Sequence, residues 1–533
     1  MPEYKGQVYR VEGTSGGWNP NPNEDAIPPG DMLDAENLNL HEGGRQTRGG
    51  TTEVNSTAIA ATPVIKGVFQ FRLDDGTEFI ICGCTNGKVY SNYTTLLHTF
   101  ATTGQKINFN VFNNTLYIWN GKNMPQTWDG AAGASSDLTN VPTSWSGTNY
   151  PANAIVHGRG ASQSIWAYGL PENPKQIFVS LTATDDFSDA NVTILSVQTE
   201  DGFGIVALEE FSEQLIAVGK SRPYIIDDSN SDRTKWGYTP AKWEGGVAHD
   251  RLLIKTPNDL IAMQEDGEIY SVIQAQSSGD FQAVSLGRPI FLHSWLKDNA
   301  DMSKIDDFFG VYDRELRAIK IFFVRANQTL PDAVLVFYID RQPTQGWMRH
   351  RYYATNFCSC AAVVRVAAGN WKIYTGGQLG QVWQLESTTI SDDGAFFYNG
   401  FLTPEMPFDN PRAEKMYDRN WVIGRKLGSE TIKAKIYIDG APIYGRFNLA
   451  DESGNNVVDE SGNSIVGNEF SSFSFTFPAD VALQRVNKLQ NISAKVGRRG
   501  LRIQTEIFND AVGEKMFVSQ LFFDYTPLGI QAE

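Results

Sequence analysis

The sequence LYIWNGKNMPQTW, residues 116–128, decides the fold. Its first four residues are leucine, aromatic or β-branched, as in a strand, and a second short strand ends at Trp128. Between them lies Asn120-Gly121, a pair that favours the tight turn of a β-hairpin. The stretch therefore predicts two antiparallel strands joined by a short turn.

The same arrangement recurs along the middle of the chain. Its first strands begin at residues 79, 116, 165, 215, 260, 316 and 371, which are 37, 49, 50, 45, 56 and 55 residues apart. Hairpins repeating every roughly 40–50 residues are typical of propeller blades, each a four-stranded sheet. One blade cannot bury both its faces, and radial stacking covers them. We predict an all-β fold with a β-propeller of about seven blades over residues 51–396; the alternative is a β-sandwich or several small barrels.

Two segments depart from the repeat. Residues 130–153 are rich in Gly, Ser, Thr, Asn and Pro, which predicts a long surface loop. Between residues 289 and 301 the apolar side chains have helical spacing, which predicts a short helix between two blades. These side chains are Ile290, Leu292, Trp295 and Leu296.

The first 50 residues differ from the repeat. Asn19-Pro20-Asn21-Pro22 and Pro28-Pro29 hold the backbone extended or turning. Within Asp31–Leu40, Leu33, Asn37 and Leu40 would share one side of a helix. We predict an extended N-terminal arm over residues 1–50 that contains this one helix. The arm has too little apolar content to fold alone, so we expect it to dock on a neighbouring copy of the chain.

From residue 397 the hairpin signature stops and short β runs follow. These runs are Lys433–Ile438, Phe470–Phe477, Leu501–Phe508 and Val518–Tyr525. An octapeptide is doubled, with Asp-Glu-Ser-Gly-Asn beginning at residue 451 and again at residue 459. We predict a β-sandwich platform over residues 397–533, with a protruding hairpin at about residues 446–468.

The composition limits the classes of partner. The net charge of −16 divides into −4 for residues 1–50, −10 for residues 51–396 and −2 for residues 397–533. Because affinity for nucleic acid comes from Lys and Arg neutralising phosphates, this balance argues against tight binding to DNA. No apolar run approaches the roughly 20 residues that span a bilayer, so no membrane segment is predicted. The N-terminus lacks the apolar core of an export signal, and we expect the protein to work where it is made.

No catalytic pattern emerges from the sequence. Five Asp-Asp pairs, at 74/75, 185/186, 227/228, 306/307 and 392/393, lie beside predicted turns, where Asp caps its own backbone. Glycosidases need two carboxylates that face each other across a cleft. The six histidines are scattered singly, and the Asp-box pattern of sialidase-like propellers is absent. We therefore predict no enzyme activity, no catalytic residues and no cofactor.

Two Cys-x-Cys pairs, Cys82/Cys84 and Cys358/Cys360, are the weak candidates for metal ligands. At strand spacing both thiols of a pair face the same side of a sheet. Zinc usually prefers two to four residues between its cysteines, so buried free thiols are the favoured interpretation, with a metal site or disulfides as alternatives. If the propeller closes between its first and last blades, Cys82 and Cys358 lie in adjacent blades.

The chain resembles the tail nozzle of short-tailed bacteriophages, a group that includes tail tubular protein B and the tail hub. The resemblance is architectural over the whole chain and is carried by motifs within residues 1–50. These motifs are Gly16-Gly17-Trp18-Asn19, Ile27-Pro28-Pro29-Gly30, Asn37-Leu38-Asn39-Leu40 and Gly44-Arg45-Gln46-Thr47-Arg48-Gly49-Gly50.

The resemblance implies a structural virion protein, assembled in the host cytoplasm into the tail. It implies a homohexameric ring below the portal and its adaptor, bearing a fibre or plug protein, through which genome DNA passes during ejection without tight binding. No active residue carries over. The competing hypothesis is a carbohydrate-binding or glycoside-cleaving propeller, since tryptophans stack sugars. Against it, Trp119, Trp128, Trp166 and Trp383 fall on predicted core strands.

Overall fold

The fold is given by a computed structural model. It describes residues 6–11, 16–41, 43–242, 244–278, 284–352, 358–408, 411–425, 431–442, 444–448, 466–470, 473–476, 489–509 and 515–530. The chain divides into two compact units. One comprises residues 1–48, 345–350 and 394–533, and the other comprises residues 49–344 and 351–393. Among the described residues no helix is long and apolar enough to cross a membrane.

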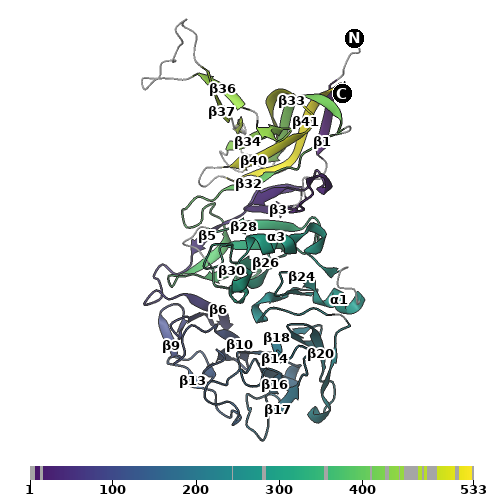
Figure 1. The fold of residues 1–533 in the computed structure, drawn as a ribbon. Coiled ribbons are helices and arrows are strands. Elements are labelled where there is room, and N and C mark those ends of the chain that lie inside the picture. The colour runs from purple at the N-terminus through teal and green to yellow at the C-terminus, as the bar shows by residue number, and fades with distance from the viewer. Residues whose placement is uncertain are drawn as a thin grey trace. The chain divides into compact units, whose positions relative to one another are not determined.

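Seven antiparallel sheets among the described residues form the blades of a β-propeller (Figure 1). The first blade contains β6 (Ile65–Arg72), β7 (Glu78–Cys84), β8 (Lys88–Ser91) and β9 (Thr95–Thr99), and the second contains β10 (Asn108–Phe112), β11 (Thr115–Trp119), β12 (Gln126–Trp128) and β13 (Ser136–Asp137). The third blade contains β14 (Asn153–His157), β15 (Ser164–Tyr168), β16 (Gln176–Val179) and β17 (Thr193–Ser196). The fourth contains β18 (Ile205–Phe211), β19 (Gln214–Gly219), β20 (Pro223–Asp227) and β21 (Gly237–Pro240). The fifth blade contains β22 (Leu253–Lys255), β23 (Leu260–Met263) and β24 (Ile269–Ser271). The sixth contains β25 (Phe309–Asp313), β26 (Ala318–Phe323), β27 (Ala333–Tyr338) and β28 (Trp347–Arg351). The seventh contains β29 (Cys360–Ala367), β30 (Asn370–Gly376), β31 (Val382–Ser387) and β5 (Gly50–Glu53).

The predicted propeller is confirmed, and its seven predicted hairpins are the second and third strands of the seven blades. In the second blade, Leu116 on β11 pairs with Trp128 on β12, so residues 116–128 form the predicted hairpin. In the seventh blade, β30 and β31 pair through Thr375 and Trp383.

Apolar clusters lie between neighbouring blades, as radial stacking requires. Between the first and second blades, Phe71 and Ile81 pack in one cluster with Leu116 and Trp128. A further cluster joins the second and third blades through Trp119 and Phe178. Each blade therefore buries both its faces only because it has a neighbour on each side.

The propeller closes with a strand from before its first blade. Glu53 on β5 pairs with Trp383 on β31, so residues 50–53 complete the seventh sheet. Gly49 and Gly50 are required there by close backbone contact. A Cβ on Gly50 would lie 2.1 Å from the Ser391 carbonyl oxygen, and one on Gly49 would lie 2.5 Å from the Ser387 carbonyl oxygen.

The two departures from the repeat differ in outcome. The short helix predicted within residues 289–301 is confirmed as α3 (Leu292–Asn299), and a second helix, α1 (Val272–Ser278), follows β24. Residues 130–153 are mostly turns, but they are not only a surface loop. Trp145 is 3% exposed and belongs to the cluster between the second and third blades, so this segment contributes to the core.

The other unit contains two six-stranded sheets (Figure 1). One is built from β1 (Gln7–Val11), β3 (Leu38–His41), β4 (Gly44–Thr47), β33 (Ala413–Arg425), β39 (Leu489–Gly500) and β41 (Phe517–Ile530). The other is built from β2 (Asp34–Glu36), β32 (Asn399–Leu402), β34 (Thr431–Ile438), β35 (Ala441–Pro442), β38 (Phe473–Thr476) and β40 (Ile503–Asn509). Asn420 on β33 donates from Nδ2 to Thr505 Oγ1 on β40 at 3.0 Å, a buried bond that joins the two sheets. They form a β-sandwich.

The helix predicted over Asp31–Leu40 is wrong. The segment forms β2 and β3, and Asn37 between them has φ of +59°, which ends any helix there. Strand β4 pairs with β41, and β2 pairs with β32, so the predicted arm is part of the C-terminal sandwich of its own chain. Docking on a neighbour is therefore not needed to bury it.

The protruding hairpin predicted at about residues 446–468 lies mainly outside the described residues. Strands β36 (Tyr444–Asn448) and β37 (Val466–Phe470) pair antiparallel on either side of it, with Asn448 opposite Val466. Residues 449–465, which hold most of the doubled octapeptide, are not described.

Candidate functional site

The first strands of the seven blades surround the axis of the propeller. They contact one another in chain order, β6, β10, β14, β18, β22, β25 and β29, and β29 contacts β6 to complete the circle. A cavity of about 210 Å³ lies between them, lined by apolar and polar side chains of these strands and of the residues just before them. Its apolar residues include Val68, Phe69, Phe109, Leu253 and Phe309. The cavity is thus small, and its wall also carries the polar side chains of Asn108, Asn153 and Arg251.

A polar network spans the channel where the first strands begin. The Asp250 carboxylate accepts from Asn108 Nδ2 at 3.1 Å and from Asn153 Nδ2 at 3.2 Å, which joins the second and third blades to the residues before the fifth. Arg251 donates from Nη2 to Asn108 Oδ1 at 3.2 Å. Lys66 Nζ lies 2.8 Å from Asp307 Oδ1 and joins the first and sixth blades. The network ties blades together across the axis.

Burial and neighbouring charges shift the pKa values of Asp250, in this network, and of Lys106 near it. Burial alone would raise the pKa of Asp250, but the hydrogen bond from His249 and the charges of Arg251 and Lys106 outweigh it and hold the pKa below its usual value. Burial, with the positive charge of Arg251, lowers the pKa of the Lys106 amine to about 8. The charged neighbours therefore favour the ionised form of Asp250, whereas burial makes the charged form of Lys106 less favourable than in water.

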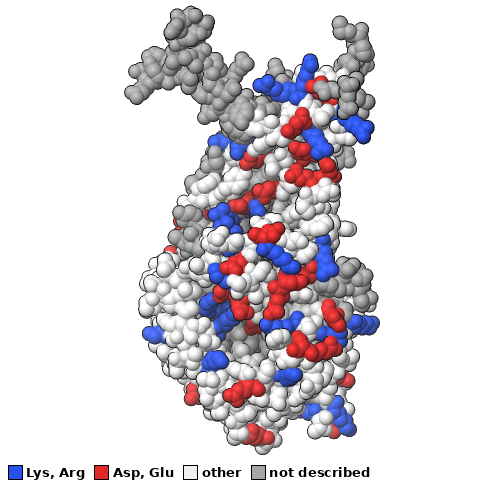
Figure 2. Space-filling model, in the orientation of Figure 1, with Lys and Arg blue, Asp and Glu red and all other residues white. Residues whose placement is uncertain are grey.

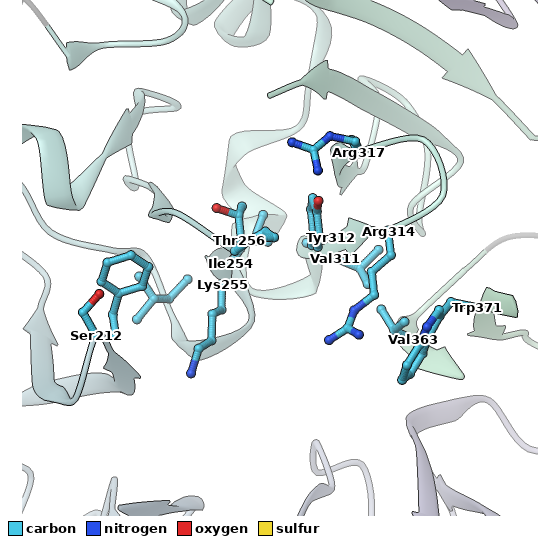
Figure 3. Close-up of a pocket in the computed structure, with 14 residues that line it drawn as sticks. Ser212, Ile254, Lys255, Thr256, Val311, Tyr312, Arg314, Arg317, Val363 and Trp371 are labelled. Carbon is cyan, nitrogen blue, oxygen red and sulfur yellow. The ribbon is translucent and has the colours of Figure 1, made fainter. Parts of the chain in front are cut away.

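A larger, open cavity of about 960 Å³ lies at the ends of the first strands, and we call it the funnel (Figure 3). Its walls come from the β18–β19 turn, the end of β22, the β25–β26 turn and the strands β29 and β30. Its lining includes the side chains of Ser212, Lys255, Tyr312, Arg314, Arg317 and Trp371. In Figure 3, Lys255 and Arg314 extend toward the same side, and Trp371 lies beside Arg314.

The three cations of the funnel differ in how their charges are satisfied. Arg317 binds the Asp340 carboxylate with two hydrogen bonds of 2.5 and 2.7 Å. Lys255 Nζ lies 3.0 Å from Glu209 Oε1. The Arg314 guanidinium lies 4.3 Å from the ring centroid of Trp371, a cation–π contact, and has no ion pair with any described residue. The funnel therefore holds one cation with no anionic partner among the residues described.

The four cysteines are buried and are not joined in disulfides. Cys82, Cys84 and Cys360 share an apolar cluster with Ile65 between the first and seventh blades. Burial raises the pKa of Cys84 to about 12 and that of Cys82 well above its usual value. Within the described part of the chain no group of three or more His, Cys, Asp or Glu side chains could hold a metal ion. The cluster lies where the propeller closes, and it brings Cys360 of the second pair together with the first pair.

Three of the Asp-Asp pairs behave as turn caps. Asp75, Asp186 and Asp227 each accept a hydrogen bond from the backbone N–H two residues later. Two other carboxylates of these pairs have further contacts: Asp307 belongs to the axial network, and Asp228 lies 3.0 Å from His157 Nε2.

The axial network and the funnel cations were not predicted from the sequence. A positional signal was nevertheless present, because Lys66, Asp250 and Asp307 all lie near the start of the first strand of a blade. The repeat was recognised from second and third strands, so the first strands were not located and this shared position went unseen. Lys255 and Arg314 likewise lie just after first strands or at their ends.

No protein-family model matches the sequence, and no curated protein matches it. Solved structures similar to the chain include YCF48 bound to D1 peptide (12% identity, 64% of this chain and 98% of that chain, TM-score 0.38) and the Pan2 WD40 domain of Neurospora crassa (11%, 66% and 98%, 0.38). Another is an exo-beta-1,3-galactanase from Phanerochaete chrysosporium with galactose (9%, 88% and 100%, 0.26). Likeness at these TM-scores carries no functional argument. The class of protein, a seven-bladed β-propeller joined to a β-sandwich, is defined by the sheets of the chain itself.

Proposed function

We propose that the chain is a structural protein of a short-tailed phage tail, a nozzle or hub ring that conducts DNA during ejection and carries other tail proteins. The observation that carries this proposal is the role of the residues behind the resemblance. Arg45 donates to the carbonyl oxygens of Gly16 and Gly30 and lies 4.6 Å from the Phe401 ring. Arg48 Nε donates to Asn37 Oδ1 at 2.8 Å and its guanidinium lies 3.9 Å from the Phe397 ring. These motif residues hold the N-terminal strands in the sandwich.

The path of DNA in this proposal runs between copies of the chain. A major groove alone is about 12 Å wide, so a duplex has no room in an axial cavity of about 210 Å³ that is spanned by hydrogen bonds and ion pairs. The propeller would therefore be a lateral module of each subunit. In the ring, the sandwich or the propeller exterior would face the genome.

Microscopy tests the ring. In a reconstruction of virions that carry this chain, we expect six copies around the tail axis, between the adaptor and the fibre or plug. A single copy on the axis, or a position outside the tail, would contradict the proposal. Negative staining of the purified protein gives the same answer at lower cost where rings form without their partners.

The carbohydrate hypothesis has less support. Trp119, Trp166 and Trp383 are each at most 1% exposed, as their placement on predicted core strands implied, so their rings are not available to sugars. A glycan array with the purified protein separates the two functions. Saturable binding to one class of glycan would favour the carbohydrate-binding propeller.

A further inference from the structure

We propose that the funnel is a binding site for an acidic peptide segment, with Arg314 as its principal carboxylate contact. The proposal goes beyond the ring function and does not depend on it. The cavity is large enough, at about 960 Å³, for several residues of an extended peptide, and its openness to solvent requires no rearrangement for entry.

The charge of the site favours an anion. Lys255, Arg314 and Arg317 line the funnel, and its lining contains no acidic residue. Two carboxylates outside the lining, Glu209 and Asp340, each pair with one of these cations. One positive charge, that of Arg314, therefore remains to be matched. Because a guanidinium binds a carboxylate through two parallel N–H···O bonds, Arg314 is well suited to bind a carboxylate of the peptide.

The position of Arg314 is prepared for such a contact. Its guanidinium rests against the Trp371 ring at 4.3 Å, which restricts the side chain while leaving its N–H edge free for an acceptor. Arg314 and Lys255 extend toward the same side of the funnel in Figure 3. Holding the cation in place before binding reduces the entropy lost when the ligand arrives.

The aromatic side chains of the funnel favour a peptide over single-stranded nucleic acid. Bases bind such grooves by stacking on exposed rings. Tyr312 is 8% exposed, Phe211 is half-buried, and Trp371 already carries Arg314 against its ring. The funnel thus supplies charge and hydrogen bonding, with Ser212 exposed at its edge, rather than a stacking platform.

Fluorescence anisotropy tests the proposal with three labelled probes added to the full chain. The probes are hexaglutamate, a peptide with the sequence of residues 451–466 (four carboxylates), and a single-stranded oligothymidine of equal charge to hexaglutamate. We expect saturable binding of both peptides that weakens as salt is added. Binding of the 451–466 peptide alone would identify a second copy of this chain as the source of the segment.

Paired variants locate the site. Arg314→Gln with Lys255→Gln should weaken peptide binding about tenfold or more, because charge-assisted hydrogen bonds are lost. The control, Lys242→Gln with Lys297→Gln, removes the same charge from exposed positions elsewhere on the propeller and should leave binding unchanged. Equal loss in both pairs, binding of the oligothymidine alone, or no saturation by either peptide up to about 1 mM would overturn the proposal.

Discussion

Lys320 on β26 is completely buried and carries a charge that the fold must balance. Its Nζ lies 2.8 Å from Glu386 Oε1 and 3.0 Å from Asp313 Oδ2. Burial favours the neutral amine, but the two carboxylates outweigh it and raise the pKa of Lys320 above its usual value. Glu386 Oε2 also accepts from the backbone N–H of Gly49 at 2.8 Å. One buried cation thus links the sixth blade, the seventh blade and the start of the closing strand.

Replacing this cation should be costly. Lys320→Met leaves Asp313 and Glu386 buried without their partner, and we expect a loss of about 3–5 kcal/mol in the free energy of unfolding. The matched control is Lys372→Met, which removes an ion pair of 2.7 Å to the exposed Glu315 and should cost at most about 1 kcal/mol. Denaturant unfolding measures both. Equal losses would mean that burial of the Lys320 pair is not what stabilises it.

The contacts of His157 predict how the stability of the protein depends on pH. Its Nδ1 lies 2.7 Å from Glu210 and its Nε2 lies 3.0 Å from Asp228. Burial opposes the charged imidazole, but the two carboxylates outweigh it and raise the pKa of His157 above its usual value. The resulting stabilisation is full below the unfolded-state pKa of about 6.5 and is lost as the pH rises through the higher folded-state pKa.

NMR titration of the imidazole resonances checks this shift. His157 should titrate above His98, whose pKa burial lowers. In His157→Gln the fall in stability between about pH 6 and pH 8 should become smaller. A His157 pKa below that of His98 would show that the carboxylates do not outweigh burial.

At the level of the strands, closure of the propeller depends on Gly50. In Gly50→Ala the new Cβ would lie 2.1 Å from the carbonyl oxygen of Ser391, which follows β31, so β5 and the segment at Ser391 must move apart. We expect a loss of about 1–3 kcal/mol in stability and faster reaction of the buried thiols Cys82 and Cys360 with a thiol reagent, because they lie at the closure. Gly237→Ala, which has nothing within 4 Å of its Cβ, is the control. Equal thiol reactivity in both variants would contradict this role for β5.

The sequence predicted the hairpins of the repeat, but it did not predict every strand whose partner is close in the chain, since β3 and β4 also pair locally. The seven hairpins and α3 depend on local spacing and turn residues, and all eight were predicted. Strand β5 pairs with a strand more than 300 residues away, and no local pattern marks such a partner. Distant contacts also contribute to the failure of the helix predicted over Asp31–Leu40, since Asn37 Nδ2 donates to the carbonyl oxygen of Tyr398 and β2 pairs with β32. The candidate site depends on such distant contacts throughout.

At the scale of the whole molecule, the propeller is an insertion into the sandwich. Residues 1–48 and 394–533 belong to one unit, and most of the chain between them forms the other. Arg45 and Arg48, which belong to the motifs that resemble the phage tail nozzle, therefore stabilise the unit that contains residues 1–48 and 394–533. A ring, if it forms, needs other surfaces than the predicted arm, because β3 and β4 are already paired within their own sheet.

The charge of the molecule leads to a last prediction, on DNA. On the face shown in Figure 2, acidic and basic side chains are interspersed, and the chain carries a net charge of −16. Bound phosphates release counterions and add affinity, which would slow a genome in transit, whereas net negative charge repels it over a Debye length of about 8 Å in physiological salt. We expect no measurable affinity of the purified protein for duplex DNA at that salt by fluorescence anisotropy. Sub-micromolar binding that weakens steeply with added salt would indicate that the protein binds DNA tightly instead of letting it pass.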